Sequence, residues 1–529
     1  MASRTYARQV VGCVRQYATH NGRRDYNAAV AALNTLQSNF SAVEAIRKAG
    51  PGWNKRAIPE MIEWVHRIGY EPSDFDQLNP VHIAGTKGKG STSTFISSIL
   101  AQYLPTRRSI PAERLPSTVG LYTSPHLRFV RERIQIDARP ISETAFARCF
   151  WEVWDRLESS APPSTDIEQR NVGGKPVYFH YLTLMALHCF LQESIGTAVV
   201  ECGIGGEYDT TNILVRPSVT GITSLGLDHE ALLGDTIESI AWHKAGIFKS
   251  TVPAFSVPQV PSAEEVLRER ARERETTLHF VTVHAALQGK NVKLGLQGEF
   301  QKMNASLAIA VSCQHLQRLG FSGIPHPLDS DSALPPEFMR GLESARLGGR
   351  CEVRHDSVQP DLTWYIDGGH TLASIQVAGE WFATASDEAA DTKTPRILIF
   401  NQQTRDAASL ARKLYETLSS ALQDSRPFEH AIFCPNVTYT TAGYKADLVS
   451  MNTNNHDIAS LKVQKALAAT WDAINPQATV HVVASIEDAV AKAREVCEGR
   501  TASVLTTGSL HLVGGLIDVL ESETEGGER

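Results

Sequence analysis

The residues with the most evident chemistry lie in one glycine-rich stretch, Val81-His-Ile-Ala-Gly-Thr-Lys-Gly-Lys-Gly-Ser-Thr-Ser-Thr94. Its apolar start is long enough for one buried strand, and apolar residues at helical spacing follow from Phe95. A strand, a glycine turn and a helix form a phosphate cradle, because backbone N–H groups and the helix N-terminus attract anions and a lysine neutralises the outer phosphates. We expect Lys89 to be that lysine; a lysine-bearing surface turn is the alternative. The residues expected to hold the nucleotide are Gly85, Thr86, Lys87, Gly88, Lys89, Gly90, Ser91 and Thr92.

The end of this loop is unusual, because Gly90 separates Lys89 from Ser91. The common nucleotide loop ends in Gly-Lys followed directly by Ser or Thr. The inserted glycine therefore argues against an ordinary motor or switch ATPase.

Polar side chains follow three further predicted strands of the first half of the chain. The carboxyl ends of parallel strands converge on one crevice, and a carboxylate, a hydroxyl and an imidazole placed there can hold Mg²⁺ against a triphosphate. Taken singly, each has a structural explanation, such as a capped strand-end acid, a turn serine or a core histidine. The strands are 119–122, 198–201 and 220–225, and the polar residues are Ser124, His126, Glu201, Asp228 and His229.

The elements that must position these residues alternate between strand and helix, which predicts a doubly wound parallel sheet. The predicted helices are 26–49, 58–68 and 177–191. A Pro-, Ser- and Asp-rich break at 320–336 is followed by a second α/β pattern, with strands at 364–366, 397–400, 431–434, 480–483 and 504–505. We therefore expect a parallel-sheet ATP-binding domain over 25–346, a smaller Rossmann-like domain over 347–520, and a disordered charged tail over 521–529. Polar insertions are expected at 161–175, 386–394 and 438–455.

The composition excludes several classes of protein. A chain of 529 residues with 42% hydrophobic residues suggests two or three domains with well-buried cores. The net charge of −7 and the lack of a basic stripe argue against nucleic acid as a partner. No apolar run is long enough to span a membrane. The 8 cysteines are scattered without a Cys-x-x-Cys pair, which suits free thiols in a reducing compartment.

The N-terminus differs from the rest of the chain. Five arginines precede the first acidic residue, Asp25, and valines lie among them. An arginine-rich, acid-free segment is typical of a mitochondrial transit peptide, here residues 1–24, and a solvated basic helix is the alternative.

The motifs together resemble those of the eukaryotic-type folylpolyglutamate synthases, in the Mur ligase superfamily. They lie in family order from about Tyr26 to Gly515. The matching segments are Ala32-Leu-Asn-Thr-Leu-Gln-Ser-Asn39, Gly85-Thr-Lys-Gly-Lys-Gly-Ser91, Tyr122-Thr-Ser-Pro-His-Leu127, Glu201-Cys-Gly-Ile-Gly-Gly-Glu-Tyr-Asp-Thr-Thr-Asn212, Leu227-Asp-His-Glu230, Ile240-Ala-Trp-His-Lys-Ala-Gly-Ile247, Gly298-Glu-Phe-Gln-Lys-Met-Asn304, Ile366-Asp-Gly-Gly-His-Thr371 and Thr507-Gly-Ser-Leu-His-Leu-Val-Gly-Gly515.

The resemblance implies a role for each site residue. Ser124 and Glu201 would ligate one Mg²⁺ and His229 a second. Lys244 would be carbamylated, so that its new carboxylate also serves the second metal; a snorkelling helix lysine is the alternative. Arg350 would reach the ATP phosphates, Asp367 the ribose, His370 the reacting phosphate and Asn304 the adenine. Ser509 and His511 would lie near the incoming amino acid. The expected catalytic residues are Lys89, His229, Lys244, Arg350 and His370.

Two positions depart from the family pattern. Phe300 stands where a histidine is usual, so the adenine contacts there would differ, and Gly348 replaces the proline of the interdomain hinge, which leaves a looser turn.

The resemblance predicts a ligase that uses ATP and two Mg²⁺, with room for a monovalent cation such as K⁺, to join L-glutamate to the γ-carboxylate of tetrahydrofolate and its polyglutamates through an acyl phosphate. We expect a monomer in the cytoplasm and the mitochondrion, in the matrix or associated with the inner membrane. Dihydrofolate synthase or a bifunctional enzyme is the closest alternative. A Mur-type peptide ligase fits less well, since only about eighty residues precede the loop. A nucleotide switch would lack the second α/β domain. A folate-binding pseudoenzyme would have lost metal or phosphate residues, all of which are present here.

Overall fold

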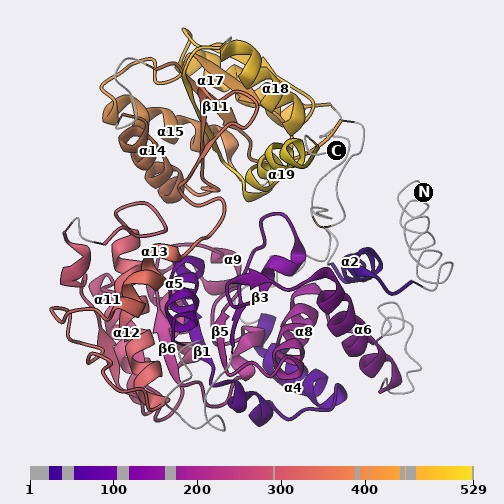
Figure 1. The fold of residues 1–529 in the computed structure, drawn as a ribbon, viewed down its shortest axis with the longest axis vertical. Helices are drawn as coiled ribbons and strands as arrows, with labels where there is room; N and C mark the ends of the chain where they lie inside the picture. The colour runs from indigo at the N-terminus through magenta and orange to yellow at the C-terminus, as the bar shows by residue number, and fades with distance from the viewer. Residues whose placement is uncertain are drawn as a thin grey trace. The chain divides into compact units, whose positions relative to one another are not determined.

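The computed structural model describes residues 23–37, 53–103, 118–160, 174–289, 292–387, 394–403, 405–440, 447, 460–497 and 499–526. The chain divides into two compact units (Figure 1). The first comprises residues 1–126, 130–295 and 299–346, and the second comprises 127–129, 296–298 and 347–529. Each unit is described by itself below.

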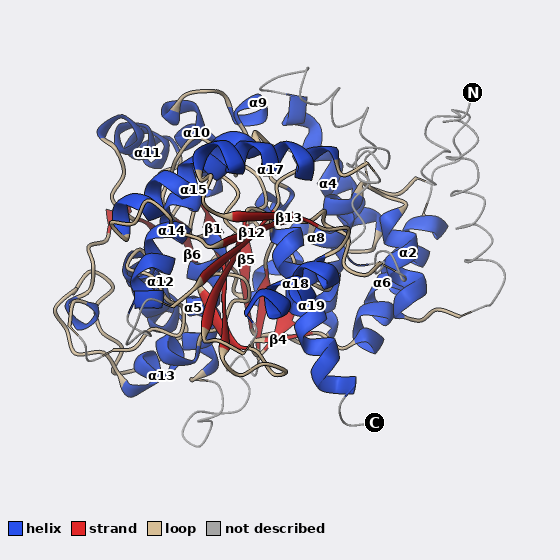
Figure 2. Ribbon diagram, turned by 90° about the horizontal axis from the view of Figure 1, so that it is seen from above, coloured by secondary structure: helices blue, strands red, loops and turns tan. Residues whose placement is uncertain are grey.

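The first unit is built on an eight-stranded sheet of order β4-β3-β2-β5-β1-β6-β7-β8. The six strands from β2 to β8 in this order run parallel, and β3 and β4 are antiparallel to their neighbours at one edge. Every residue of the central strands β1, β2, β5 and β6 is buried, because helices cover both faces (Figure 2). The strands are β1 (Val81–Ala84), β2 (Val119–Tyr122), β3 (Ile134–Ile136), β4 (Arg139–Pro140), β5 (Thr197–Glu201), β6 (Val219–Ile222), β7 (Ala254–Ser256) and β8 (Leu278–Phe280).

The helices of this unit pack their apolar faces on that sheet. α5 contacts β2, β5, α12 and α13, while a cluster around Ala84, Cys202 and Ile222 joins the sheet to α10 and α11 on the other face. The helices are α2 (Tyr26–Asn34), α4 (Ala57–Arg67), α5 (Lys89–Ala101), α6 (Glu143–Ser159), α8 (Tyr178–Gln192), α9 (Glu230–Leu233), α10 (Ile237–Lys244), α11 (Pro261–Glu273), α12 (Gln301–Arg318) and α13 (Pro336–Ser344), with short 3-10 turns η1 (Trp53–Arg56), η2 (Pro72–Leu78), η3 (Val130–Arg133), η4 (Thr210–Ile213), η5 (Ala245–Ile247) and η6 (Ala285–Leu287).

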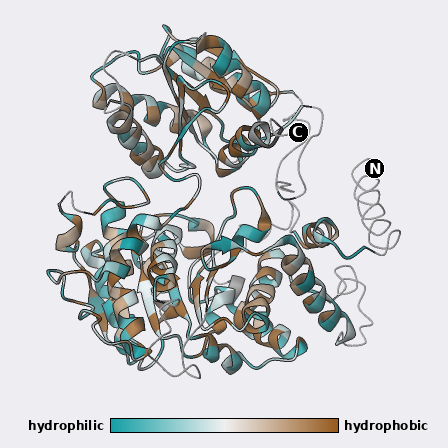
Figure 3. Cartoon of the chain, in the orientation of Figure 1, coloured by the Kyte–Doolittle hydropathy of each residue, from teal (hydrophilic) through white to brown (hydrophobic). Residues whose placement is uncertain are grey.

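The second unit repeats the same layered design with a six-stranded sheet of order β13-β12-β11-β14-β10-β9. All pairings are parallel except β9 with β10. The strands of this sheet are mainly hydrophobic, whereas the helices that cover it carry both hydrophobic and hydrophilic residues (Figure 3). The elements are β9 (Glu352–His355), β10 (Leu362–Ile366), α14 (Leu372–Asp387), β11 (Arg396–Phe400), α15 (Ala407–Ala421), β12 (His430–Phe433), α17 (Lys462–Ile474), β13 (Thr479–Val482), α18 (Ile486–Cys497), β14 (Ala502–Thr507) and α19 (Leu510–Gly526).

The predicted class of two mostly parallel α/β sheets is confirmed, and three local predictions differ. The helix expected over 26–49 ends at Asn34, where Thr35 begins a turn; residues 38–52 lie outside the described part. Residues 521–526, expected in a disordered tail, continue α19, and Glu521 pairs with Arg128 and Arg354. The antiparallel strands β3, β4 and β9 were not expected from the sequence.

Several predicted segments fall outside the described residues. These are the transit segment, except for residues 23 and 24, and most of the three polar insertions. Within the described residues, seven cysteines are buried and free, and no helix is both long and apolar enough to cross a bilayer.

Candidate active site

The phosphate loop follows the central strand β1 and bends sharply before α5. Gly85 and Gly88 have φ values of +145° and +89°, which favour glycine. A β-carbon at Gly88 would lie 2.2 Å from Asn304 Oδ1, so this position also requires a residue without a side chain. The Thr86 and Lys87 N–H groups donate to the Ser224 carbonyl at 2.9 and 3.0 Å, so the N–H groups that can face an anion are those at the N-terminus of α5, where no acidic residue opposes it.

Three contacts made by side chains of the loop hold its shape. Lys89 Nζ donates to the Gly85 carbonyl at 3.0 Å, and the Thr86 hydroxyl donates to the Gly226 carbonyl at 3.1 Å. Lys87 forms an ion pair with Asp228 at 3.3 Å. These contacts join the loop after β1 to the loop after β6, which carries Asp228 and His229.

Ser91 and Thr92 lie behind the loop, in the buried first turn of α5. The Thr92 N–H donates to the Gly88 carbonyl at 2.8 Å, so it is used within the helix. Gln301 Nε2 donates to Ser91 Oγ at 3.2 Å, and Asn304 Nδ2 donates to Gln301 Oε1 at 2.9 Å. The structure thus places Asn304 beneath the loop as a support, and its expected contact with adenine stays a prediction.

The loops after β2 and β5 bring a hydroxyl and a carboxylate together. The Glu201 side chain is only 3% exposed, and its Oε2 accepts hydrogen bonds from the Thr123 hydroxyl and, at 3.2 Å, from the Ser124 N–H. Ser124 is therefore adjacent to Glu201, as the sequence predicted. His126 lies farther along the same loop, where its Nδ1 accepts from Arg133 Nε at 2.9 Å.

Asp209 organises the loop after β5, a role the sequence analysis did not assign. Its carboxylate accepts from the backbone N–H groups of Gly203, Ile204 and Thr211 at 3.0 to 3.1 Å, and from the Thr211 hydroxyl. The Asp-Thr-Thr-Asn run that begins at Asp209 is a local turn signal in the sequence. That Asp209 also binds the N–H groups of Gly203 and Ile204 is seen only in the structure.

That loop supports the end of α10, where Lys244 lies. The Glu207 N–H donates to the His243 carbonyl at 2.7 Å, and a β-carbon at Gly206 would lie 2.7 Å from the Lys244 carbonyl. Lys244 is only 2% exposed. Burial lowers the pKa of Lys244 to about 7, and the nearby Lys89 ammonium adds to the effect. With a pKa of about 7, this lysine has a substantial neutral, nucleophilic fraction at physiological pH.

His229 takes a different kind of position. It caps the N-terminus of α9 with a left-handed φ of +54°, and its side chain is exposed. Its backbone N–H donates to Asp228 Oδ1 at 3.0 Å.

In the second unit, Asp367 follows β10 as a buried carboxylate. Its oxygens accept from the Cys351 N–H at 3.0 Å and the Gly369 N–H at 2.8 Å. Burial raises the pKa of Asp367, and the positive charge of Arg350 opposes that rise. The structure therefore brings Arg350 and Asp367 close together, at a turn where Cys351 has a positive φ of 46°.

His370 is held by the same turn, because its Nδ1 donates to the Gly368 carbonyl at 2.8 Å. This bond fixes the proton on Nδ1, so Nε2 is the unprotonated nitrogen in the neutral tautomer. Ser509 is buried after β14 and accepts from Asn436, whose side chain in turn accepts from Asn401 at 2.8 Å. His511 lies in the first turn of α19 and is exposed.

The chain is similar to curated proteins over most of its length. It is 46% identical to the folylpolyglutamate synthase of Neurospora crassa over 503 residues, which cover 94% of this chain and 92% of the relative. The chain belongs to the folylpolyglutamate synthase family. It is also 47% identical to the folylpolyglutamate synthase of Saccharomyces cerevisiae strain FostersO over 500 residues, covering 94% of this chain and 87% of that one. No protein-family model matches the chain.

Solved folylpolyglutamate synthases share the Mur ligase-like fold. A Mycobacterium tuberculosis folylpolyglutamate synthase complexed with ADP and AMPPCP superposes with a TM-score of 0.63 at 22% identity, over 93% of this chain and 99% of that one. A folylpolyglutamate synthase–AMPPCP–folate complex gives a TM-score of 0.59 at 23% identity, over 91% and 100%. The predicted family and fold are therefore confirmed.

The residues that this folylpolyglutamate synthase-family chain offers to Mg²⁺ fit a hard cation. Within the described residues, no group of three His, Cys, Asp or Glu side chains forms a metal cluster. The expected ligands are instead a buried carboxylate and a neighbouring serine, at Glu201 and Ser124, together with His229 and a modified Lys244. The oxygen atoms of Glu201 and Ser124 suit Mg²⁺, which takes few protein ligands beside substrate phosphates, whereas His229 would offer a nitrogen and Lys244 an oxygen only once carbamylated.

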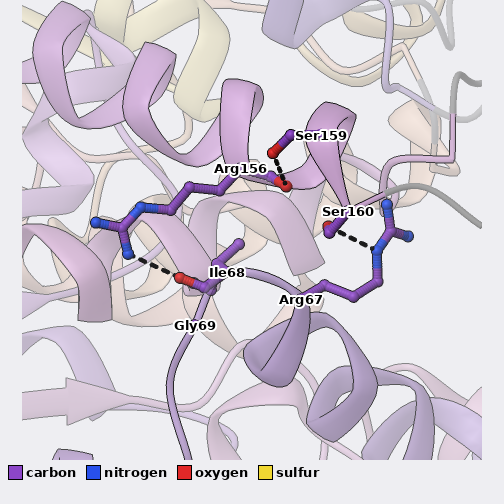
Figure 4. A pocket seen from close by; sticks show the side chains of 6 residues that line it. All are labelled: Arg67, Ile68, Gly69, Arg156, Ser159 and Ser160. Atoms are coloured by element: carbon purple, nitrogen blue, oxygen red, sulfur yellow. Dashed lines mark hydrogen bonds between the residues drawn. The ribbon is translucent and has the colours of Figure 1, made fainter.

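A shallow cavity of about 360 Å³ lies elsewhere in this family member, at the C-terminal ends of α4 and α6 (Figure 4). It is lined in part by Arg67 and Arg156, and both guanidinium groups already donate to helix-end carbonyls, those of Leu157 and Ile68. Ser159 and Ser160 complete its polar wall. None of the predicted site residues lines this cavity, and its arginines act as helix caps.

Proposed function

We propose that this chain is an ATP-dependent ligase that joins L-glutamate to the γ-carboxylate of tetrahydrofolate and its polyglutamates. The observation that carries the proposal is the phosphate loop after β1, next to the strand that ends in the buried Glu201 and with Lys89 near enough to the buried Lys244 to lower its pKa, in a chain 46% identical to a named folylpolyglutamate synthase over 94% of its length. The γ-phosphate of ATP is transferred to the folate carboxylate, and the glutamate amine then attacks the acyl phosphate and releases phosphate.

The chain's own residues supply positioning and positive charge. A carboxylate that attacks a triphosphate brings two anions together, so the step requires neutralisation. The N-terminus of α5 and Lys89 receive the phosphates in the first unit. In the second unit, Arg350 offers a planar guanidinium to phosphate oxygens, Asp367 accepts a ribose hydroxyl, and His370 faces the reacting phosphate.

Two Mg²⁺ ions would be held by Ser124 and Glu201, and by His229 and a carbamylated Lys244. Bound there, Mg²⁺ supplies electrostatic stabilisation of the charge that develops on the transferred phosphoryl group. The lowered pKa of Lys244 supports carbamylation, because only the neutral amine attacks CO₂. A monovalent cation such as K⁺ is a further expected component.

The proposal is tested by ATP-dependent incorporation of labelled glutamate, with purified protein offered tetrahydrofolate in one reaction and dihydropteroate in another, in Mg²⁺ and K⁺. Incorporation with tetrahydrofolate alone is expected. Incorporation with dihydropteroate alone would reassign the chain as a dihydrofolate synthase, and incorporation with both would make it bifunctional. Binding of ATP and folate without incorporation would indicate a pseudoenzyme.

We also propose that the protein works as a monomer in the cytoplasm and the mitochondrion, in the matrix or at the inner membrane. The arginine-rich, acid-free segment 1–24 supports mitochondrial import. A fluorescent protein fused after residue 60 should enter mitochondria, and a matched fusion with the five arginines changed to glutamine should not. Uptake that does not depend on the arginines would contradict the assignment.

A further inference from the structure

Arg133 is a buried cation that has no acidic partner in the part of the chain that the structure describes. It lies at the end of η3 and is only 4% exposed. Its Nε–H donates to His126 Nδ1 at 2.9 Å, but its buried Nη1 has no hydrogen-bond partner, and among the described residues no carboxylate forms an ion pair with it. A guanidinium kept from water without a counter-charge is costly, so folding alone does not explain it.

The surroundings of Arg133 suit an aromatic acid. Its guanidinium carbon lies 5.4 Å from the ring centroid of Phe179 and 6.0 Å from that of Tyr178, at the start of α8. Phe179 is 58% exposed and Val177 is 43% exposed. An exposed aromatic ring therefore lies near a buried cation, with the exposed Val177 two residues before it, and such a pairing binds molecules that carry both an aromatic ring and a negative charge.

Arg133 is also tied to the residues expected to hold Mg²⁺. The Thr123 N–H donates to the Arg133 carbonyl at 3.0 Å, and the Thr123 hydroxyl donates to Glu201. Ser124 follows directly and donates its N–H to the same carboxylate. An anion bound by Arg133 would thus lie beside the loop that presents Ser124 and Glu201.

We propose that Arg133 binds the α-carboxylate of the acceptor's terminal glutamate, with Phe179 and Val177 lining the path of its aminobenzoyl ring. This proposal rests on the proposed function. The γ-carboxylate must stay available for phosphorylation, so the α-carboxylate is the anion that a fixed guanidinium can hold throughout the reaction. The exposed Phe179 ring changes rotamer to admit the acceptor, a motion within ordinary side-chain freedom.

The test compares two acceptors in three proteins. The acceptors are monoglutamyl tetrahydrofolate and the same molecule with its α-carboxylate converted to the amide; the proteins are wild type, Arg133→Met and Arg133→Lys. In wild type, the KM for the amide should exceed that for the acid about 10- to 100-fold, the value of a charge-assisted hydrogen bond. Arg133→Met should raise the KM for the acid to that for the amide, and should leave the KM for the amide and the KM for ATP unchanged within about twofold. Arg133→Lys should give a KM for the acid between those of wild type and Arg133→Met.

A matched control is Arg139→Met, which removes an exposed arginine from the neighbouring strand β4 and should change neither KM. If wild type uses acid and amide equally well, or if Arg133→Met weakens both acceptors by the same factor, Arg133 has only a structural role and the proposal fails. If Arg133→Met does not fold, the acid–amide ratio of wild type against Arg133→Lys decides. Acceptor affinity, followed by quenching of protein fluorescence without turnover, tests the site even if no glutamate is incorporated, and so separates its failure from failure of the proposed function.

Discussion

Replacing Lys244 by methionine should make the protein more stable and inactive at the same time. The side chain is 2% exposed, and burial followed by repulsion from Lys89 lowers its pKa from 10.5 to about 7. The native fold therefore resists the charged form of this lysine. Methionine has a similar length and no charge to bury.

The size of the effect follows from the shift. A change from 10.5 to about 7 is worth about 1.4 kcal/mol per pKa unit, which gives a cost of roughly 4 kcal/mol near pH 7. The unfolded chain binds the proton more tightly than the folded one, so the stability of the wild type rises as the pH increases from 7 towards 10.5. The advantage of Lys244→Met should accordingly shrink to about 2 kcal/mol at pH 9.

The assay is urea denaturation of wild type and Lys244→Met in CO₂-free buffer at pH 7 and pH 9, paired with labelled-glutamate incorporation. Incorporation should fall at least about a hundredfold, as when a charge-stabilising group is removed. Added bicarbonate should not restore incorporation by Lys244→Met. In the wild type, ¹³C-labelled bicarbonate should give a carbamate signal at one lysine, and this signal should be absent from Lys244→Met.

A matched control is Lys249→Met. Lys249 is partly buried and its pKa is lowered to about 8, but its Nζ donates to the Asn212 carbonyl at 3.0 Å and it is not an expected metal ligand. This variant should change stability and keep turnover within a few-fold. Wild-type-like turnover by Lys244→Met, or a loss of stability as large as the predicted gain, would refute the reasoning.

Three further predictions concern the loop, the metal and the ribose site. Gly88→Ala should abolish ATP binding measured by calorimetry, because a β-carbon there would lie 2.2 Å from Asn304. The double variant with Asn304→Ala should recover part of the binding. If it recovers none, the defect lies in the φ of +89° alone. Glu201→Gln should raise the Mg²⁺ needed for half-maximal activity about tenfold or more, and an unchanged Mg²⁺ requirement would remove Glu201 from the metal site. The pKa of Asp367 is raised, so its carboxylate should take up a proton at a higher pH than an ordinary aspartate, and the affinity for ATP should fall as that proton binds. Asp367→Asn should abolish this pH dependence. A pH profile identical in both proteins would show that another group titrates.

The elements that the sequence predicts best are the buried central strands. Runs such as 81–84 and 197–201 are buried throughout because helices cover both faces, and they are mainly apolar, with His82, Thr197 and Glu201 as the polar members. The edge strands β4 and β9 have only two and four residues, and partly exposed ones, so little in their composition distinguishes them from loop. The helix from Tyr26 is overextended in the prediction for a related reason, since partial periodicity continues in the sequence beyond the turn at Thr35.

Within the site, motif spacing predicts which loops carry chemistry but not how their side chains are held. That Ser124 and Glu201 meet follows from strand order, which parallel topology makes predictable. The role of Asp209 as a loop organiser depends on how its own loop closes. The role of Asn304 as a support under Gly88 depends on packing between segments that are far apart in the sequence. The burial of Arg133 depends likewise on α8, and no local pattern indicates it.

The most direct test of the central claim follows one atom through the reaction. Tetrahydrofolate labelled with heavy oxygen in its γ-carboxylate is incubated with the protein, ATP, Mg²⁺ and glutamate, and the released phosphate is analysed by mass spectrometry. Ligation through an acyl phosphate predicts that one heavy oxygen appears in phosphate for each glutamate joined, with one ADP formed. Glutamate joined while the phosphate stays unlabelled would contradict the account.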